Sequence, residues 1–162
     1  MDLFWETEGL HNGRMTAVCD KDKRVRFLLR RNLSETLNYK LLNADAKIIG
    51  SIKCSQSNPD HLAITLGNQS YGTLIKLAGS NHPLYVLRGG NWLISGTVVT
   101  NRYYAYHGIS AVFSTEPLAN GASIQLWCMN PDNAAASLLI VSALDQVRMN
   151  TIHKQEPLSY SF

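Results

Sequence analysis

The sequence is poor in the residues that cross-link small extracellular domains or ligate metals. Its 162 residues include three cysteines, Cys19, Cys54 and Cys128, which lie far apart. An odd number of dispersed cysteines argues against a disulfide framework and against a zinc site of the CxxC type. We therefore expect reduced, buried thiols.

The five histidines are dispersed, and the common catalytic motifs are missing. The histidines lie more than four residues from one another and from every cysteine, which is not metal-site spacing, so we interpret them as turn or surface residues: His11, His61, His82, His107 and His153. Neither the Gly-x-Ser-x-Gly elbow nor a phosphate-binding Gly-rich loop occurs. The sequence thus predicts no catalytic residue, no metal and no cofactor. A Ser/His/Asp set from distant segments stays open as an alternative, because triads assemble across a fold.

Linkers and export signals are likewise missing from the sequence. No Gly/Ser-rich or Pro-rich stretch of linker length divides the chain, so we expect residues 1–162 to form a single domain. Acidic residues stand near the start, at Asp2 and Glu6, where a secretory peptide needs a basic region followed by a long apolar one. We expect a cytoplasmic protein, with peripheral contact to a membrane as an open extension.

The longest apolar run comes late, from Asn133 to Leu144. Pro131 and Asp132 supply a rigid first turn and an oxygen able to cap a helix, and polar residues return after Leu144, so we predict a helix over 132–148 and a tail over 153–162. A helix that is apolar nearly all round must be enclosed. At about 1.5 Å per residue the apolar segment from Ala134 to Leu144 spans only about half of a ~30 Å hydrocarbon core, which disfavours a membrane span.

The rest of the chain reads as short strands separated by turns. Two-residue periodicity predicts two hairpins near the start, with turns at 20–23 and 43–46, and further strands at 61–66, 71–77, 84–88, 92–97, 102–106, 109–114 and 123–129. So many short strands call for two packed sheets or a barrel, because an open sheet would leave long edges. We therefore expect a closed antiparallel barrel of about twelve strands around the late helix, because it pairs the strand edges and encloses the apolar helix.

Positive charge concentrates near the start, although the net charge is only +3. The candidate site residues of this basic stretch are Arg14, Lys21, Lys23, Arg24, Arg26, Arg30 and Arg31. Alternation places Arg24 and Arg26 on one strand face, with Val25 and Phe27 on the other. Such a stripe suits an anionic lipid surface, and it equally suits a solvated face that blocks edge-to-edge pairing.

Aromatic residues form a second cluster, comprising Trp92, Tyr103, Tyr104, Tyr106 and Phe113, with Arg102 adjacent. A sheet surface of this kind could stack bases or meet a membrane interface. Alternation puts Tyr103 opposite to Tyr104 and Tyr106, so only part of the set can face solvent together. We therefore favour core and cross-strand packing, and we do not expect a nucleic-acid partner.

The stretch from Gly90 to Arg148 resembles the tubby C-terminal-like group, which includes the LURP-one-related proteins and the phospholipid scramblases. The resemblance rests on Gly90-Asn-Trp-Leu-Ile94, Tyr104-Ala-Tyr-His-Gly-Ile-Ser-Ala-Val-Phe113, Ser123-Ile-Gln-Leu-Trp-Cys-Met129, the entry Asn130-Pro-Asp132 and the helix ending Ala143-Leu-Asp-Gln-Val147. A looser match enters Lys47-Ile-Ile-Gly-Ser-Ile52 from the turn at 43–46.

The resemblance implies a barrel of about twelve antiparallel strands enclosing a hydrophobic helix. It also implies a role in binding phosphoinositides, acting at bilayers or regulation, without a shared catalytic site. No functional residue transfers, and the Pro-rich start and Cys-rich run of scramblases are missing. Our leading hypothesis is a non-enzymatic regulatory or adaptor domain that contacts acidic phospholipid head groups through the basic stretch. The alternative is a protein-interaction or structural module without lipid affinity.

Overall fold

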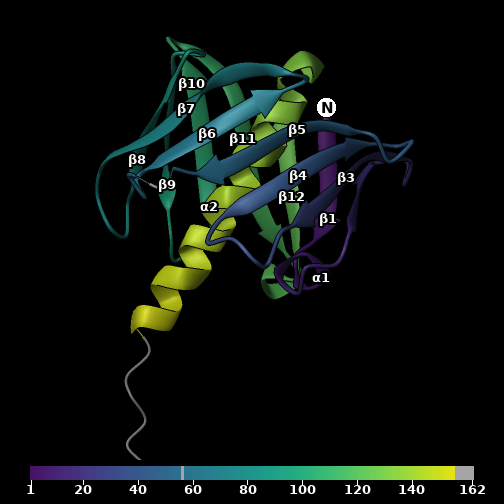
Figure 1. The fold of residues 1–162 in the computed structure, drawn as a ribbon, viewed down its shortest axis with the longest axis horizontal. Coiled ribbons are helices and arrows are strands. Elements are labelled where there is room, and N and C mark those ends of the chain that lie inside the picture. The colour runs from purple at the N-terminus through teal and green to yellow at the C-terminus, as the bar shows by residue number, and fades with distance from the viewer. Residues whose placement is uncertain (56, 156–162) are drawn as a thin grey trace, which may run out of the picture.

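The computed structural model describes residues 1–55 and 57–155, which form a closed antiparallel barrel around a helix (Figure 1). The strands are β1 (Asp2–Glu6), β2 (Thr16–Asp20), β3 (Val25–Arg31), β4 (Asn38–Asn43), β5 (Ile48–Cys54), β6 (His61–Leu66), β7 (Gln69–Ala78), β8 (Leu84–Arg88), β9 (Trp92–Thr97), β10 (Arg102–His107), β11 (Ser110–Leu118) and β12 (Ser123–Cys128). A short helix, α1 (Glu8–His11), follows β1, and a 3-10 turn, η1 (Ala119–Gly121), precedes β12. The predicted architecture is confirmed.

Strand order follows the chain, so the barrel is a simple meander. Each strand from β2 to β12 pairs with its sequence neighbours, and β1 closes the ring between β12 and β2. The period-2 pattern predicted eleven of these strands. It missed β1, although Leu3 and Trp5 of that strand point inward and are buried while Glu6 is exposed.

The central helix begins at a capped turn. The 3-10 turn η2 (Pro131–Asn133) leads into α2 (Ala134–Gln155), and the side-chain Oδ1 of Asn130 accepts a hydrogen bond from the Asp132 amide at 3.0 Å. The sequence suggested that Asp132 supplies the capping oxygen. In the structure this oxygen belongs to Asn130 instead. The helix also extends seven residues beyond the predicted end at Arg148, because no glycine or proline interrupts the chain before Pro157. Residues 156–162 of the predicted tail lie outside the described part.

The helix is enclosed as the apolar run required. Its eight core residues are at most 2% exposed: Ala134, Ala136, Leu138, Leu139, Ile140, Val141, Ala143 and Leu144. Inward-facing rows of the strands, such as Leu41 of β4 and Ile52 of β5, pack around it and are fully buried. The barrel interior is therefore one continuous hydrophobic core with α2 as its axis.

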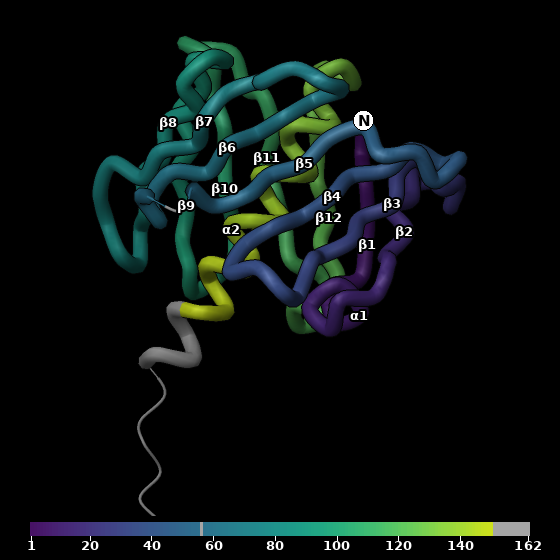
Figure 2. Tube along the Cα trace, in the orientation of Figure 1, coloured from purple at the N-terminus to yellow at the C-terminus, as the bar shows by residue number. Residues whose placement is uncertain are grey.

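The two ends of the barrel differ in what they carry. Helix α2 enters at the end that holds the β2–β3, β4–β5 and β10–β11 turns, which we term the entry end. It leaves at the opposite end, the exit end, beside α1 and the β3–β4 and β9–β10 loops. Figure 2 shows the chain of α2 running through the barrel and out below it. Segments far apart in sequence therefore meet around the helix at the exit end.

Candidate functional site

The structure divides the predicted basic stretch between the two ends of the barrel. Lys21, Lys23 and Arg24 lie in the β2–β3 turn at the entry end, and Arg14 lies in the α1–β2 loop at the exit end. Between them Arg26 and Arg30 are exposed on the outer face of β3, as the alternation predicted for Arg26. The seven residues therefore do not form a single compact patch.

Positive charge at the entry end is partly neutralised. The Asp20 side chain accepts hydrogen bonds from the backbone amides of Asp22 and Arg24 at 2.9 and 3.0 Å, which fixes the turn. It also lies 3.9 Å from the Arg26 guanidinium. Acidic and basic side chains thus alternate here, and an exposed ion pair of this kind contributes little to stability.

The exit end holds a cationic hollow. It has a volume of about 390 Å³, and its lining consists of Arg30, Arg31 and Lys40 together with Gly13, Asn32, Leu33 and Ser34. Among the described residues no acidic side chain lines it. Arg30 and Lys40 lie directly opposite each other in the β3–β4 ladder. Like charges in that position destabilise a sheet, so packing gives no reason for this pair.

The β3–β4 loop folds over the hollow through its own side chains. The Asn32 Oδ1 atom accepts hydrogen bonds from the Ser34 amide at 3.1 Å and from the Ser34 hydroxyl at 2.7 Å, which is the geometry of an Asx turn. Glu35, the nearest acid in the loop, accepts a hydrogen bond from Asn38 Nδ2 at 2.8 Å. Leu33 projects from the loop with 58% of its surface exposed. The hollow thus combines three cations with an exposed apolar side chain.

Sequence reasoning did not find Lys40, and it placed Arg31 with the surface cations. The alternation that puts Arg30 outward turns Arg31 inward, beside Leu29 on the core side of β3. Arg31 is half-buried, and its Nη1 donates a hydrogen bond to the His11 carbonyl at 3.2 Å. Lys40 joins the site through the strand register, which period-2 alternation alone does not supply.

A buried polar cluster lies behind the hollow, where α2 leaves the barrel. Its centre is Asp145 of α2, which is only 3% exposed. The carboxylate accepts hydrogen bonds from His11 Nε2 at 2.6 Å and from Asn101 Nδ2 at 3.2 Å, and it lies 3.6 Å from Arg148 Nη1. We term Asp145 with His11, Asn101, Arg148 and Arg31 the mouth cluster.

The mouth cluster corrects two expectations. His11 was interpreted as a turn or surface residue, but it ends α1 with its side chain 23% exposed and bonded to Asp145. Asp145 was expected to mark returning polarity after the apolar run, but it sits inside the barrel because partners distant in sequence compensate its charge. Within the described chain, no serine, threonine or cysteine hydrogen-bonds to His11, so this pair lacks the nucleophile of a triad.

Three tyrosine hydroxyls inside the barrel resist ionisation. Burial raises the pKa values of Tyr39 and Tyr103, and it raises that of Tyr85 to about 12, because the phenolate would lose its hydration. The negative charge of Asp145 further raises the pKa values of Tyr39 and Tyr103.

These shifts predict loss of stability in alkali. An unfolded tyrosine releases its proton near pH 10, whereas Tyr85 in the barrel holds it to about pH 12. Between these values the unfolded chain binds fewer protons, so the free energy of unfolding falls as pH rises, by about 2–3 kcal/mol for Tyr85 alone. The loss of near-ultraviolet circular dichroism should coincide with the part of the phenolate absorbance change that the three buried hydroxyls contribute. The Tyr85→Phe variant should flatten this dependence, and early ionisation of the three hydroxyls in a native barrel would contradict the argument.

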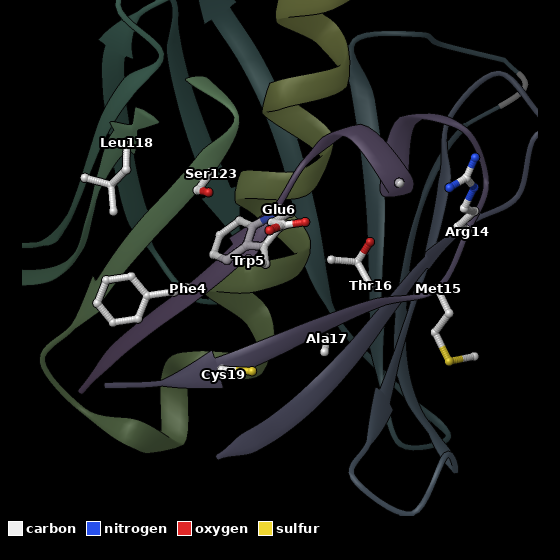
Figure 3. A pocket seen from close by; sticks show the side chains of 11 residues that line it. Phe4, Trp5, Glu6, Arg14, Met15, Thr16, Ala17, Cys19, Leu118 and Ser123 are labelled. Carbon is white, nitrogen blue, oxygen red and sulfur yellow. The ribbon is translucent and has the colours of Figure 1, made fainter. Parts of the chain in front are cut away.

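A second hollow lies at the seam where β1 meets β2 (Figure 3). These strands pair only at Leu3 with Asp20 and Phe4 with Cys19, whereas every other neighbouring pair shares at least four positions. Beyond Phe4 the strands diverge, as the figure shows, around a volume of about 540 Å³. The main apolar side chains at its rim are Phe4, Met15 and Leu118, and its charged ones are Glu6 and Arg14. Arg14 therefore belongs to this seam pocket rather than to the cationic hollow.

The remaining candidates from the sequence have structural explanations. Trp92, Tyr103 and Phe113 are buried in the core, and Tyr104 and Tyr106 are each 43% exposed, which confirms the predicted division of the aromatic cluster. Trp92 meets Phe113 edge to face at 6.4 Å between ring centroids. Such packing accounts for these rings without a ligand.

The cysteines form no disulfide in the part of the chain that the structure describes. The cysteines are free; Cys128 is buried, whereas Cys19 and Cys54 are only half-buried, so the expectation of buried thiols is correct for one of the three. His61 lies in β6, and His82 and His107 are exposed. The described residues contain no group of three histidine, cysteine or acidic side chains able to hold a metal ion. The side chain of His153 lies outside the described part.

Comparison with known proteins establishes the fold. The X-ray structure of the Arabidopsis thaliana protein AT5G01750 is similar to this chain, with a TM-score of 0.63, 15% sequence identity and 90% of each chain covered. That protein has a LURP-one-related, tubby-like fold, so the fold that the resemblance implied is confirmed. No protein-family model and no curated protein matches the sequence. None of the helices in the described part is both long enough and apolar enough to cross a bilayer.

Proposed function

We propose that this chain is a non-enzymatic regulatory or adaptor domain whose cationic hollow binds the acidic head groups of phospholipids at a membrane surface. The observation that carries the proposal is the meeting of Arg30, Arg31 and Lys40 around one hollow, with no acidic side chain lining it in the described chain. Arginine offers paired donors to phosphate oxygens, and lysine adds a point charge. Each cation near an anionic leaflet contributes about 1 kcal/mol to binding.

Exposed apolar side chains beside the hollow support contact with a bilayer. Leu33 is 58% exposed in the β3–β4 loop, and Met15 is 46% exposed after the α1–β2 loop. Both loops lie at the exit end with the hollow. Apolar side chains next to cations let a domain combine electrostatic attraction with shallow burial at the head-group boundary. Arg14 of the α1–β2 loop and Arg26 on the outer face of β3 are further exposed cations outside the hollow.

The test is co-sedimentation with vesicles of phosphatidylcholine, with and without phosphatidylserine or phosphoinositide. The variant Arg30→Glu/Lys40→Glu should lose about 30-fold or more in affinity for anionic vesicles, because about 2 kcal/mol of attraction disappears and repulsion replaces it. The matched control Lys21→Glu/Lys47→Glu makes the same charge change at exposed positions of the entry end and should keep most of the affinity. Equal losses in both variants, or wild-type binding no stronger than to neutral vesicles, would contradict the proposal.

A single substitution separates binding from folding. Arg30→Glu places opposite charges across the β3–β4 ladder, which should stabilise the barrel by about 0.2–1 kcal/mol while it weakens vesicle binding. A variant that is more stable and binds less well cannot owe its defect to misfolding.

The seam pocket favours a second candidate function, a protein-interaction module. The ladder is weakest there, and Phe4, Met15 and Leu118 offer an apolar lining that a segment of another polypeptide would cover. If this is the function, Phe4→Glu/Met15→Glu should abolish capture of the partner. The wild-type protein should then bind anionic vesicles no better than the Arg30→Glu/Lys40→Glu variant does.

A further inference from the structure

We propose that Asp145 of the central helix is a positioning residue for the cationic hollow, acting through His11 on Arg31. This inference rests on the proposed function, because it explains how one of the cations of the hollow is held. It links three segments that are distant in sequence, namely the end of α1, the end of β3 and the middle of α2.

The first step is the cost of burying Asp145. A carboxylate that is 3% exposed loses most of its hydration, which costs several kcal/mol unless partners replace it. Enclosing α2 does not require a charge at this position, since an apolar residue of similar size would pack there. The carboxylate therefore has a specific task, and its shortest contact, at 2.6 Å, is with His11.

The second step is that His11 contacts both Asp145 and Arg31, through different groups. Its imidazole is bonded to Asp145, and its backbone carbonyl accepts the hydrogen bond from Arg31 Nη1. Helix α1 has only four residues and no side-chain cap at its first turn, so it has little stability of its own. The bond to Asp145 anchors α1 to the core helix, and α1 in turn holds the guanidinium.

The third step is that little else holds Arg31. Among the described residues its buried Nε has no hydrogen-bond partner, and neither has the hydroxyl of Tyr39, its cross-strand neighbour. Arg31 draws the pKa of Tyr39 downward while Asp145 draws it upward, so both charges lie close to one hydroxyl. Without His11, the Asp145 carboxylate would keep Asn101 and Arg148 but lose its shortest contact, and the guanidinium would be free to turn from the hollow toward it.

The test is a double-mutant cycle read out by binding to vesicles of phosphatidylcholine containing phosphatidylserine. His11→Ala should lower the affinity of the otherwise wild-type protein about 5-fold and should have no further effect in the Arg31→Gln background, because the two changes act on the same group. His11→Gln, whose amide can still donate to Asp145, should restore most of the affinity. Lys47→Gln removes an exposed cation at the entry end, outside both the cationic hollow and the mouth cluster, and it should leave the affinity unchanged.

A second readout needs no lipid. The side-chain NMR resonance of the Arg31 Nε–H group should shift in His11→Ala and in Asp145→Asn, and should return toward its original position in His11→Gln. Equal losses of affinity from His11→Ala with and without Arg31, or an unmoved Arg31 resonance in a folded His11→Ala variant, would overturn the inference. Failure of the wild-type protein to bind anionic vesicles while the resonance shifts as expected would overturn the proposed function alone.

Discussion

Replacing Leu139 by aspartate is expected to leave the chain unfolded at 25 °C. Leu139 is fully buried in the first half of α2, and its Cδ1 atom lies 3.2 Å from the position that a Cβ atom on Gly50 would take. A carboxylate there would be enclosed by leucine and isoleucine side chains with no compensating partner. The cost of such a burial, several kcal/mol or more, is comparable with the whole stability of a small domain.

A graded series makes this test quantitative. Leu139→Ala should lower the free energy of unfolding by about 2–5 kcal/mol in denaturant titrations, because it removes apolar contacts and leaves a cavity. Met129→Asp makes a comparable change on a side chain that is 59% exposed, and it should cost less than about 0.5 kcal/mol. Native near-ultraviolet circular dichroism in Leu139→Asp would show that α2 is not the enclosed axis of the core.

The barrel could be predicted largely because the sequence pattern within each segment indicates a strand or a helix. Alternation along 84–88 and 92–97 gives strands whose bounds match the structure, since their inward residues are buried in the core and their outward ones are at least partly exposed. Strand β1 carries the same signal at Leu3 and Trp5.

The candidate site could be predicted only in part, because its members meet through tertiary structure. Arg30 could be placed on a surface by alternation, but Lys40 becomes its neighbour only through the β3–β4 register. Asp145 follows an apolar run, which locally indicates a helix leaving the core. Its partner His11 lies 134 residues away, and the sequence around either residue does not indicate that the two pair.

Replacing Gly50 by valine is expected to destabilise the barrel by about 3 kcal/mol, the second large effect of a single substitution. Gly50 lies on the inner face of β5, where a Cβ atom would stand 2.8 Å from Leu66 Cδ2, 3.0 Å from the Thr65 carbonyl oxygen and 3.2 Å from Leu139 Cδ1. The carbonyl is part of the β5–β6 ladder and cannot retreat without breaking it. Overfilling of this kind costs about 1–3 kcal/mol, and more where backbone is involved.

A compensating substitution identifies the cause of that loss. In the Leu139→Ala background the valine would find space on the helix side, so Gly50→Val should cost at least about 1 kcal/mol less there than in the wild type, as measured by urea unfolding. Gly9→Ala is the matched control, because a Cβ at Gly9 in α1 meets nothing closer than 3.6 Å, and the change should be neutral or slightly stabilising. Additive losses from Gly50→Val and Leu139→Ala would mean that β5 and α2 do not meet at this position. Helix α2 can approach β5 this closely only opposite a glycine. Additive losses would therefore mean that α2 occupies a different position in the barrel, and that Asp145 lies at a different place at the exit end.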